Sequence, residues 1–174
     1  MQNPFTLTFG KSPLEPIERP LQTMEIVDTF TAETVNQQMF IITGVQGSGK
    51  TVMMTEIARR LREREDWVVI ELNPATDLLQ GMLAKLNSNK VCAAIIKSAK
   101  IDLSFFGFGV AIEGVPPLTD TETAIITILE KLKKQDKRLL ITIDEVTNND
   151  YMKVFAGSFQ IFVRQDLPVF LLAT

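Results

Sequence analysis

Eight residues in the first third of the chain constrain its fold more than any other stretch. They combine three glycines, a lysine and two hydroxyl residues in the order Gly44-Val45-Gln46-Gly47-Ser48-Gly49-Lys50-Thr51. Residues 39–43, just before them, form a short and almost continuously apolar run, which predicts a strand buried on both faces. Residues 52–61, just after them, repeat apolar side chains at helical spacing. A glycine-rich loop between a buried strand and a helix indicates an α/β fold.

The spacing of this loop fits the pattern G-x-x-x-x-G-K-[ST], which binds the phosphates of a nucleoside triphosphate. Glycines let successive backbone N–H groups face an anion at the positive end of the following helix, and a side chain at Gly44 or Gly49 would obstruct that approach. Lys50 would then reach the β- and γ-phosphates, and the Thr51 hydroxyl would bind Mg²⁺. ATP is the expected nucleotide; the sequence contains no guanine-selecting N-K-x-D motif, but it leaves the choice between ATP and GTP open.

The remaining apolar patterns predict a three-layer α/β/α domain with a mainly parallel sheet. Three more strands are expected at residues 67–72, 139–143 and 169–173, and the C-terminus cuts off the last of them, which leaves the sheet incomplete. Helices are expected at residues 21–36, 52–61, 78–98 with a break near 87–89, 119–132 and 148–165. Two short strands on either side of a turn at residues 106–109 predict an inserted β-hairpin over residues 100–114.

A pair of carboxylates, Asp144 and Glu145, follows the strand at residues 139–143. The carboxyl ends of strands are where open α/β sheets bind ligands, and the pair has the form of a Walker B motif. Asp144 is suited to hold Mg²⁺, usually through water, and Glu145 is suited to take a proton from an attacking water. The long separation from the glycine-rich loop, with a further strand in between, favours the P-loop branch that has an additional strand and a catalytic glutamate.

Composition narrows the chemistry further. Histidine is absent, which removes the commonest general base and zinc ligand, so any reaction must use carboxylates, lysine and bound metal. A single cysteine, Cys92, excludes a disulfide framework and favours a reduced, cytoplasmic protein. The formal net charge of −3 provides no general basic field for nucleic acid. No apolar run approaches the ~20 residues that span a bilayer, and the N-terminus lacks the parts of a signal peptide.

Together these motifs resemble AAA+ and STAND-type ATPases, in particular the bacterial and archaeal ATPases that are similar to origin-recognition initiators. The likeness is carried by residues 40–51 and by the segment from Asn3 to Pro13. It implies that residues 1–20 form an extended strap beside the adenine, with Ile17 and Arg19 near the base, ahead of an ATPase core at residues 21–174. It also implies that Thr174, at the tip of the fourth strand, contacts the γ-phosphate or the attacking water. A fifth strand, a helical lid and any C-terminal domain would follow residue 174, so the core is expected to be truncated.

The expected function is that of an ATP-dependent switch module, in which Thr51 and Asp144 hold Mg²⁺ and Glu145 activates water for hydrolysis to ADP and phosphate. The resemblance implies that an arginine finger comes from a neighbouring subunit of a homo-oligomer or other assembly, so hydrolysis by the chain alone should be slow. DNA is expected to be contacted only through regions outside this chain, and no membrane is expected. Three alternatives stay open: a nucleotide-binding regulatory module that does not hydrolyse, a nucleotide or small-molecule kinase, and a replication-initiator or helicase-loader subunit.

Overall fold

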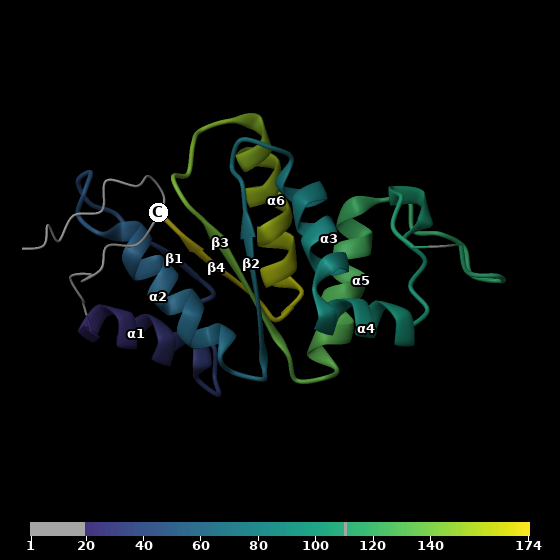
Figure 1. Cartoon of the computed structure of the whole chain (residues 1–174), viewed down its shortest axis with the longest axis horizontal. Coiled ribbons are helices and arrows are strands. Elements are labelled where there is room, and N and C mark those ends of the chain that lie inside the picture. Colours follow the sequence, from purple (N-terminus) through teal and green to yellow (C-terminus); the bar gives the residue numbers. More distant parts are fainter. Residues whose placement is uncertain (1–19, 110) are drawn as a thin grey trace, which may run out of the picture.

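Four parallel strands form the sheet at the centre of the molecule. The computed structural model describes residues 20–109 and 111–174. Within them the strands are β1 (Met39–Ile41), β2 (Trp67–Leu72), β3 (Arg138–Ile143) and β4 (Val169–Ala173). Their order across the sheet is β1-β4-β3-β2, so β4 lies between β1 and β3 (Figure 1). The strand expected between the two motifs in the sequence is present as β2, and the loop strand β1 and the Asp144 strand β3 are not neighbours in the sheet. The parallel sheet is confirmed.

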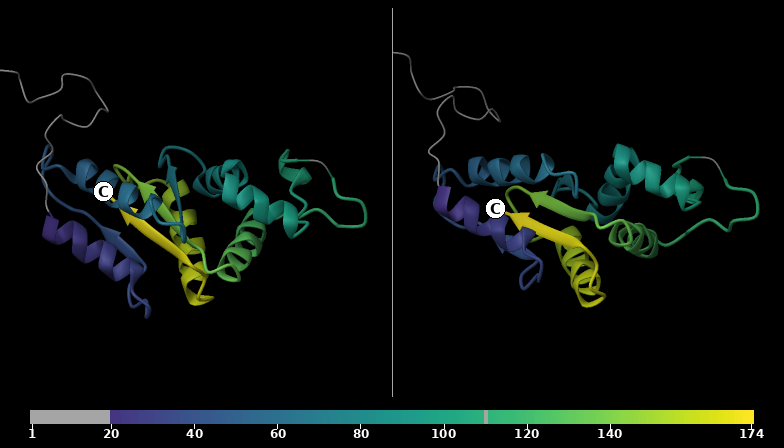
Figure 2. Two further views of the ribbon diagram at one scale, coloured as in Figure 1. Left: turned by 60° about the horizontal axis from the view of Figure 1, so that its bottom comes forward. Right: turned by 90° about the horizontal axis from the view of Figure 1, so that it is seen from below.

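Helices cover both faces of this sheet, which gives the three layers predicted from the sequence. The helices are α1 (Pro20–Thr31), α2 (Lys50–Arg62), α3 (Leu78–Ser88), α4 (Lys90–Ser98), α5 (Thr121–Lys133) and α6 (Asp150–Arg164). Figure 2 shows α2 and α6 on opposite sides of the strands. Alternate residues of β3 point to opposite faces of the sheet, as expected for a strand. Leu140 packs with α1 and α2, whereas Ile141 packs with α3 to α6. No helix among the described residues combines the length and apolar character needed to cross a membrane.

The smaller of the two cores is built around an aromatic cluster between α1 and the sheet. The Phe30 ring of α1 lies with its centroid 5.3 Å from that of Phe40 and 5.1 Å from that of Phe170, and Trp67 completes the cluster. The Arg138 guanidinium stands 5.9 Å from the Trp67 centroid and donates to the Phe30 carbonyl at 2.7 Å. A cation bound to the last carbonyls of a helix complements the helix dipole. Arg138 thereby joins the end of α1 to the start of β3.

The larger core lies on the other face and contains the single cysteine. Cys92 is fully buried among the apolar side chains of α3, α4 and α5. Burial raises the pKa of its thiol to about 12, because the charged thiolate would lose its hydration there. The thiol therefore stays neutral at physiological pH, and its place in the fold is that of a small apolar side chain.

Two expectations about the first part of the chain need correction. The first helix ends at Thr31 and does not continue to residue 36. The strand at residues 39–43 was expected to be buried on both faces, but the face of β1 that carries Met39 and Ile41 is open, and within residues 20–109 and 111–174 β1 pairs only with β4. Its Met39 and Ile41 side chains are 44% and 56% exposed. An apolar run reports the character of the side chains, and it does not report whether a neighbouring strand stands on each side.

The hairpin predicted for residues 100–114 is wrong. The described part of this stretch contains no strand and instead holds a single 3₁₀ turn, Ser104–Phe106. Asp102 is almost completely buried, and its carboxylate accepts hydrogen bonds from the Ser104 N–H at 2.9 Å and the Ile112 N–H at 2.8 Å. A side chain that takes up backbone donors competes with the ladder of a hairpin. Asp102 therefore organises this segment as a loop that extends away from α4 and α5 (Figure 2).

Asp102→Ala is expected to loosen the loop while leaving the sheet intact. Hydrogen bonds from the Ser104 side chain and from the Ile112 and Ser104 backbone hold the pKa of Asp102 below its ordinary value of 3.8. A carboxylate with a lowered pKa stabilises the fold above the unfolded pKa, and that contribution is lost as the pH falls through the folded pKa. Amide hydrogen exchange at Ser104 and Ile112 should rise at least about tenfold in the variant at neutral pH. Glu113→Ala, an exposed carboxylate in the same loop, is the control; equal protection in Asp102→Ala and the unchanged chain would contradict this role.

Candidate functional site

The glycine-rich loop joins β1 to α2 and needs glycine for two different physical reasons. A Cβ at Gly44 would stand 2.8 Å from the Ser48 hydroxyl oxygen, so a side chain at this position would force the Ser48 side chain to move. Gly47 and Gly49 have room for a Cβ, but their φ angles of 78° and 82° lie in the left-handed region. The backbone thus turns twice in a conformation that other residues adopt at a cost of about 1–2 kcal/mol each. Val45 and Gln46 lie on the exposed outer part of the loop.

The loop ends at the start of α2, where backbone donors are open to an anion. Gly49 is the N-cap residue of the helix and has no side chain that could cap the first N–H groups. The first turn also contains no acidic residue. Uncapped N–H groups at the positive end of a helix dipole form a ready site for phosphate. Lys50 begins the helix, and its Nζ donates to the carbonyls of Gly44 and Val45 at 3.1 Å each. The lysine ammonium is thus held over the loop.

Thr51, the second residue of α2, forms a hydrogen bond with Asp144. The Thr51 hydroxyl donates to the two Asp144 carboxylate oxygens, at 3.0 Å from Oδ2 and 3.2 Å from Oδ1. These residues are 93 positions apart in the chain and come from the first turn of α2 and the carboxyl end of β3. Two adjacent oxygen ligands of this kind suit Mg²⁺, which binds few protein oxygens and keeps several waters. Residues 20–109 and 111–174 contain no group of three or more His, Cys, Asp or Glu side chains positioned for a metal.

Thr174 lies beside these two residues at the tip of β4. Its hydroxyl donates to Asp144 Oδ1 and accepts from the Glu145 N–H at 2.9 Å. The backbone strengthens this junction, since the Val146 N–H donates to the Thr174 carbonyl at 2.9 Å. Thr174 therefore contacts Asp144 directly. It also fixes Glu145, the residue after Asp144, through the Glu145 N–H. Asp144 accepts from two hydroxyls, one on each side.

Glu145 begins the loop after β3 in an unusual backbone conformation. Its φ of 55° lies in the left-handed region, which a residue with a Cβ rarely adopts. Strain of this kind persists where surrounding contacts fix it, and here Thr174 holds the Glu145 N–H. The Glu145 side chain is exposed, and its carboxylate forms no ion pair with another described residue. It is therefore accessible from solvent at this end of the sheet.

Several residues near the site could not be found from motifs. The Asn149 side chain donates to the Pro74 carbonyl at 2.8 Å and accepts from the Met152 N–H at the start of α6. It links the loop after β3 to the loop after β2. An asparagine just before a helix is a recognisable N-cap signal in a sequence. The contact of Asn149 with Pro74, in contrast, has no signal in the sequence. A cavity of about 460 Å³ opens beside Asp144, with lining residues Glu71, Leu72, Asn73, Pro74 and Lys85.

The structure thus brings together most of the residues that the sequence pointed to. Lys50, Thr51, Asp144, Glu145 and Thr174 converge at the carboxyl ends of β1, β3 and β4. Ile17 and Arg19, expected near the base, lie outside the described residues, as does the rest of the N-terminal segment before residue 20.

Comparison with known proteins identifies the family. No curated protein matches the sequence. Residues 24–162 match the model of a family described as an ATPase domain predominantly from Archaea. The matched region covers well over half of the chain and includes the glycine-rich loop, Asp144 and Glu145. The chain therefore belongs to this family of ATPase domains.

Proposed function

We propose that this domain binds ATP with Mg²⁺ at residues 44–51 and hydrolyses it to ADP and phosphate. The observation that carries the proposal is the contact of Thr51 with Asp144, 3.0 Å apart at the start of a helix and the end of a strand. A lysine and a set of uncapped helix N–H groups stand next to this contact. The domain would act as the nucleotide switch of a larger cytoplasmic AAA+-like or STAND-like protein, in which hydrolysis resets a conformation.

Binding would depend on the loop and on Lys50. Phosphate oxygens would accept hydrogen bonds from the backbone N–H groups at the start of α2, where the helix dipole favours negative charge. Lys50 would exchange its two carbonyl acceptors for phosphate oxygens, which are charged and therefore stronger acceptors. Thr51 and Asp144 would hold Mg²⁺ between protein and nucleotide. When bound, the ion would reduce the negative charge that repels an incoming nucleophile.

Hydrolysis would require a base for the attacking water. In this step the water oxygen forms a bond to the γ-phosphorus while the bond from that phosphorus to the β–γ bridging oxygen breaks. The electron pair of the broken bond leaves with ADP, and the water proton passes to the Glu145 carboxylate. Thr174 would hold Glu145 in place through its N–H, and its own hydroxyl stands next to Asp144. Lys50 would stabilise the charge that develops on the leaving oxygens.

The arginines of the chain bear on the expected rate. Among the described residues, Arg59, Arg60, Arg64 and Arg138 already bind carboxylates or carbonyls of the domain itself. Arg62 and Arg164 lie in the last turns of α2 and α6, at the helix ends away from the glycine-rich loop and Asp144. An additional cation at the γ-phosphate would therefore come from a neighbouring subunit, and such a residue can accelerate hydrolysis by 10³–10⁵-fold in related chemistry. We expect the isolated domain to turn over slowly for this reason.

Lys50→Ala should weaken binding of a fluorescent ATP analogue about ten- to a hundredfold, because hydrogen bonds to charged groups contribute about 1.5–3 kcal/mol. The measurement is fluorescence anisotropy of the analogue titrated with the purified domain, with Mg²⁺ present and after its removal by chelation. Removal of Mg²⁺ should also weaken binding to the unchanged domain. Lys153→Ala, at an exposed lysine of α6, provides the matched control and should bind normally. Equal affinity of the Lys50 and Lys153 variants would contradict the proposed site.

A further inference from the structure

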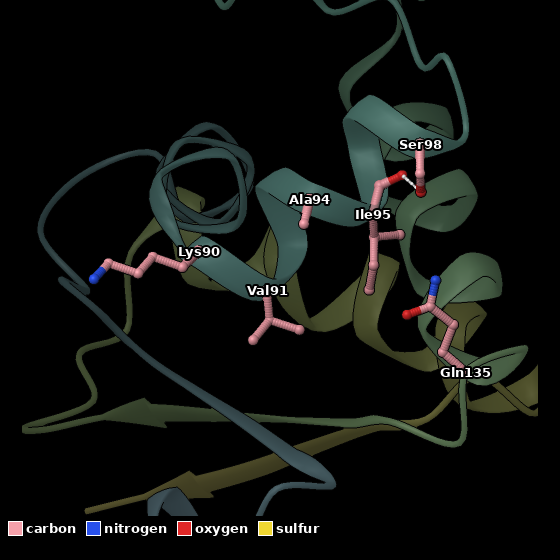
Figure 3. A pocket seen from close by; sticks show the side chains of 6 residues that line it. All are labelled: Lys90, Val91, Ala94, Ile95, Ser98 and Gln135. Carbon is pink, nitrogen blue, oxygen red and sulfur yellow. Dashed lines mark hydrogen bonds between the residues drawn. The ribbon is translucent and has the colours of Figure 1, made fainter.

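A groove separates α4 from the turn that follows α5. It has a volume of about 510 Å³, and its lining residues are Lys90, Val91, Ala94, Ile95, Ser98 and Gln135. Figure 3 shows Val91, Ala94 and Ile95 on one side of α4, with Gln135 facing Ile95 from the turn and Lys90 extending from one end. We call this feature the α4 groove. None of its lining residues belongs to the candidate ATP site.

The floor of the α4 groove has the spacing of a helix-packing surface. Val91, Ala94 and Ser98 are exposed and follow one another at i, i+3 and i+7, which places them in one stripe along the helix. Val91 is 38% exposed although it is a large aliphatic residue, and Ala94 is exposed beside it. The short side chains of Ala94 and Ser98 allow another helix to approach closely. The neighbouring stripe of α4, with Cys92, Ile95 and Ile96, is already buried against the domain, so Ile95 forms only the inner edge of the groove.

Positive charge is concentrated around this groove, although the chain as a whole carries a net charge of −3. Residues 78–101 contain lysines and no acidic residue. Lys97 follows Lys90 by two helical turns, so both lie along the same side of α4. The other wall is formed by the uncharged Gln135, just after α5. Lys90 and Lys97 form no ion pair with another described residue.

We propose that the α4 groove binds an acidic amphipathic helix of a partner protein. The apolar face of that helix would cover Val91 and Ala94, and carboxylates beside that face would pair with Lys90 and Lys97 on the rim. A helix in a groove is a recurring mode of recognition in which anchors spaced by one turn fill apolar positions. The apolar floor disfavours a nucleic acid backbone, which needs donors to phosphate along its whole path. The lysines would add specificity for the acidic sequence over others.

The position of the groove separates this interaction from the nucleotide site. Gln135 comes just before β3, whereas Asp144 follows the opposite end of that strand. A strand of this length spans roughly 20 Å. Partner binding and ATP binding can therefore be tested independently, and the proposal does not depend on ATP hydrolysis.

The experiment uses the full chain and fluorescein-labelled probes in anisotropy titrations. The first probe is a helical peptide of roughly 16 residues, long enough to form a helix, with leucines at i, i+3, i+4 and i+7 and glutamates on both sides of them. The second replaces every glutamate with lysine. The third is a DNA duplex of about the same net charge as the acidic peptide. The acidic peptide should bind with a micromolar dissociation constant that weakens as salt rises, and the other two should not bind.

Variants locate the binding surface. Ala94→Glu, which places bulk and negative charge on the floor, and the double variant Lys90→Glu with Lys97→Glu should each weaken the acidic peptide at least about tenfold. Lys153→Glu makes the same charge change on α6 and should leave the affinity unchanged. All variants should bind the ATP analogue normally, which separates failure of this proposal from failure of the ATP site. Absence of peptide binding, equal binding by the groove variants, or binding of DNA in place of the acidic peptide would each overturn the proposal.

Discussion

Glu145→Gln should bind the ATP analogue as tightly as the unchanged domain and release phosphate about 10²–10³-fold more slowly, the range expected for loss of a general base. Glutamine keeps the size of the side chain but cannot accept the proton of the attacking water at neutral pH. The backbone at this position, with its φ of 55°, is held by Thr174 through the N–H and does not depend on the carboxylate. Single-turnover phosphate release, measured beside the binding titration, separates the two effects.

Two further variants make this result specific. Glu113→Gln, at an exposed glutamate of the loop after α4, is the control and should hydrolyse ATP at the unchanged rate. Glu71→Gln tests another base, because Glu71 lines the cavity beside Asp144. Loss of hydrolysis in the Glu71 variant but not in the Glu145 variant would identify Glu71 of β2 as the general base. Binding without phosphate release by the unchanged domain would instead favour a regulatory module that does not hydrolyse.

The parts of the fold that sequence could predict are those that local patterns determine. The spacing from Gly44 to Thr51 is a local signal, because each residue type serves the conformation or chemistry of one loop. The position of Asp144 follows from a general property of parallel sheets, in which the carboxyl ends of strands gather at one edge. The break near residues 87–89 was also predicted. In the structure Asn89 accepts from the N–H groups of Val91 and Cys92 and caps α4 there.

Other parts depend on contacts between residues far apart in sequence, which periodicity does not report. The run at residues 39–43 looks buried, yet among the described residues the sheet order leaves β1 at an edge. The turn at residues 106–109 predicted a hairpin, yet the carboxylate of Asp102 takes up the donors that a hairpin would have used. The start of the helix expected at residues 119–132 is a similar case. Asp120 caps α5, and Glu122 accepts a hydrogen bond from Ser158 of α6.

The basic end of α5 is another feature that only the fold explains. Clustered lysines at a helix terminus suit the helix dipole. In the structure two of the lysines in this run also have partners far away in the sequence: Lys133 binds Asp166, and Lys137 binds the Glu65 carbonyl. These lysines therefore join the end of α5 to the loops before β2 and β4.

Phe30→Ala should lower the free energy of unfolding by about 3–5 kcal/mol, the usual cost of truncating a buried phenylalanine. Phe30 is completely buried and contacts Phe40, Trp67 and Phe170 in the aromatic cluster. Removing its ring leaves a cavity that the rigid neighbouring rings cannot fill. It also weakens the attachment of α1, whose last carbonyls bind Arg138. Urea denaturation followed by circular dichroism measures the loss.

The single tryptophan provides a second readout within the cluster. Trp67 lies 6.3 Å from Phe30 between ring centroids, so its fluorescence reports the packing of α1 on the sheet. Phe105→Ala, at a ring that is 62% exposed, is the matched control and should change stability by less than about 0.5 kcal/mol. If Phe30→Ala lost no more stability than the control while the tryptophan spectrum changed, α1 would be detaching without unfolding of the sheet. That outcome would contradict a single cooperative unit and would place α1 outside the structure that supports the ATP site.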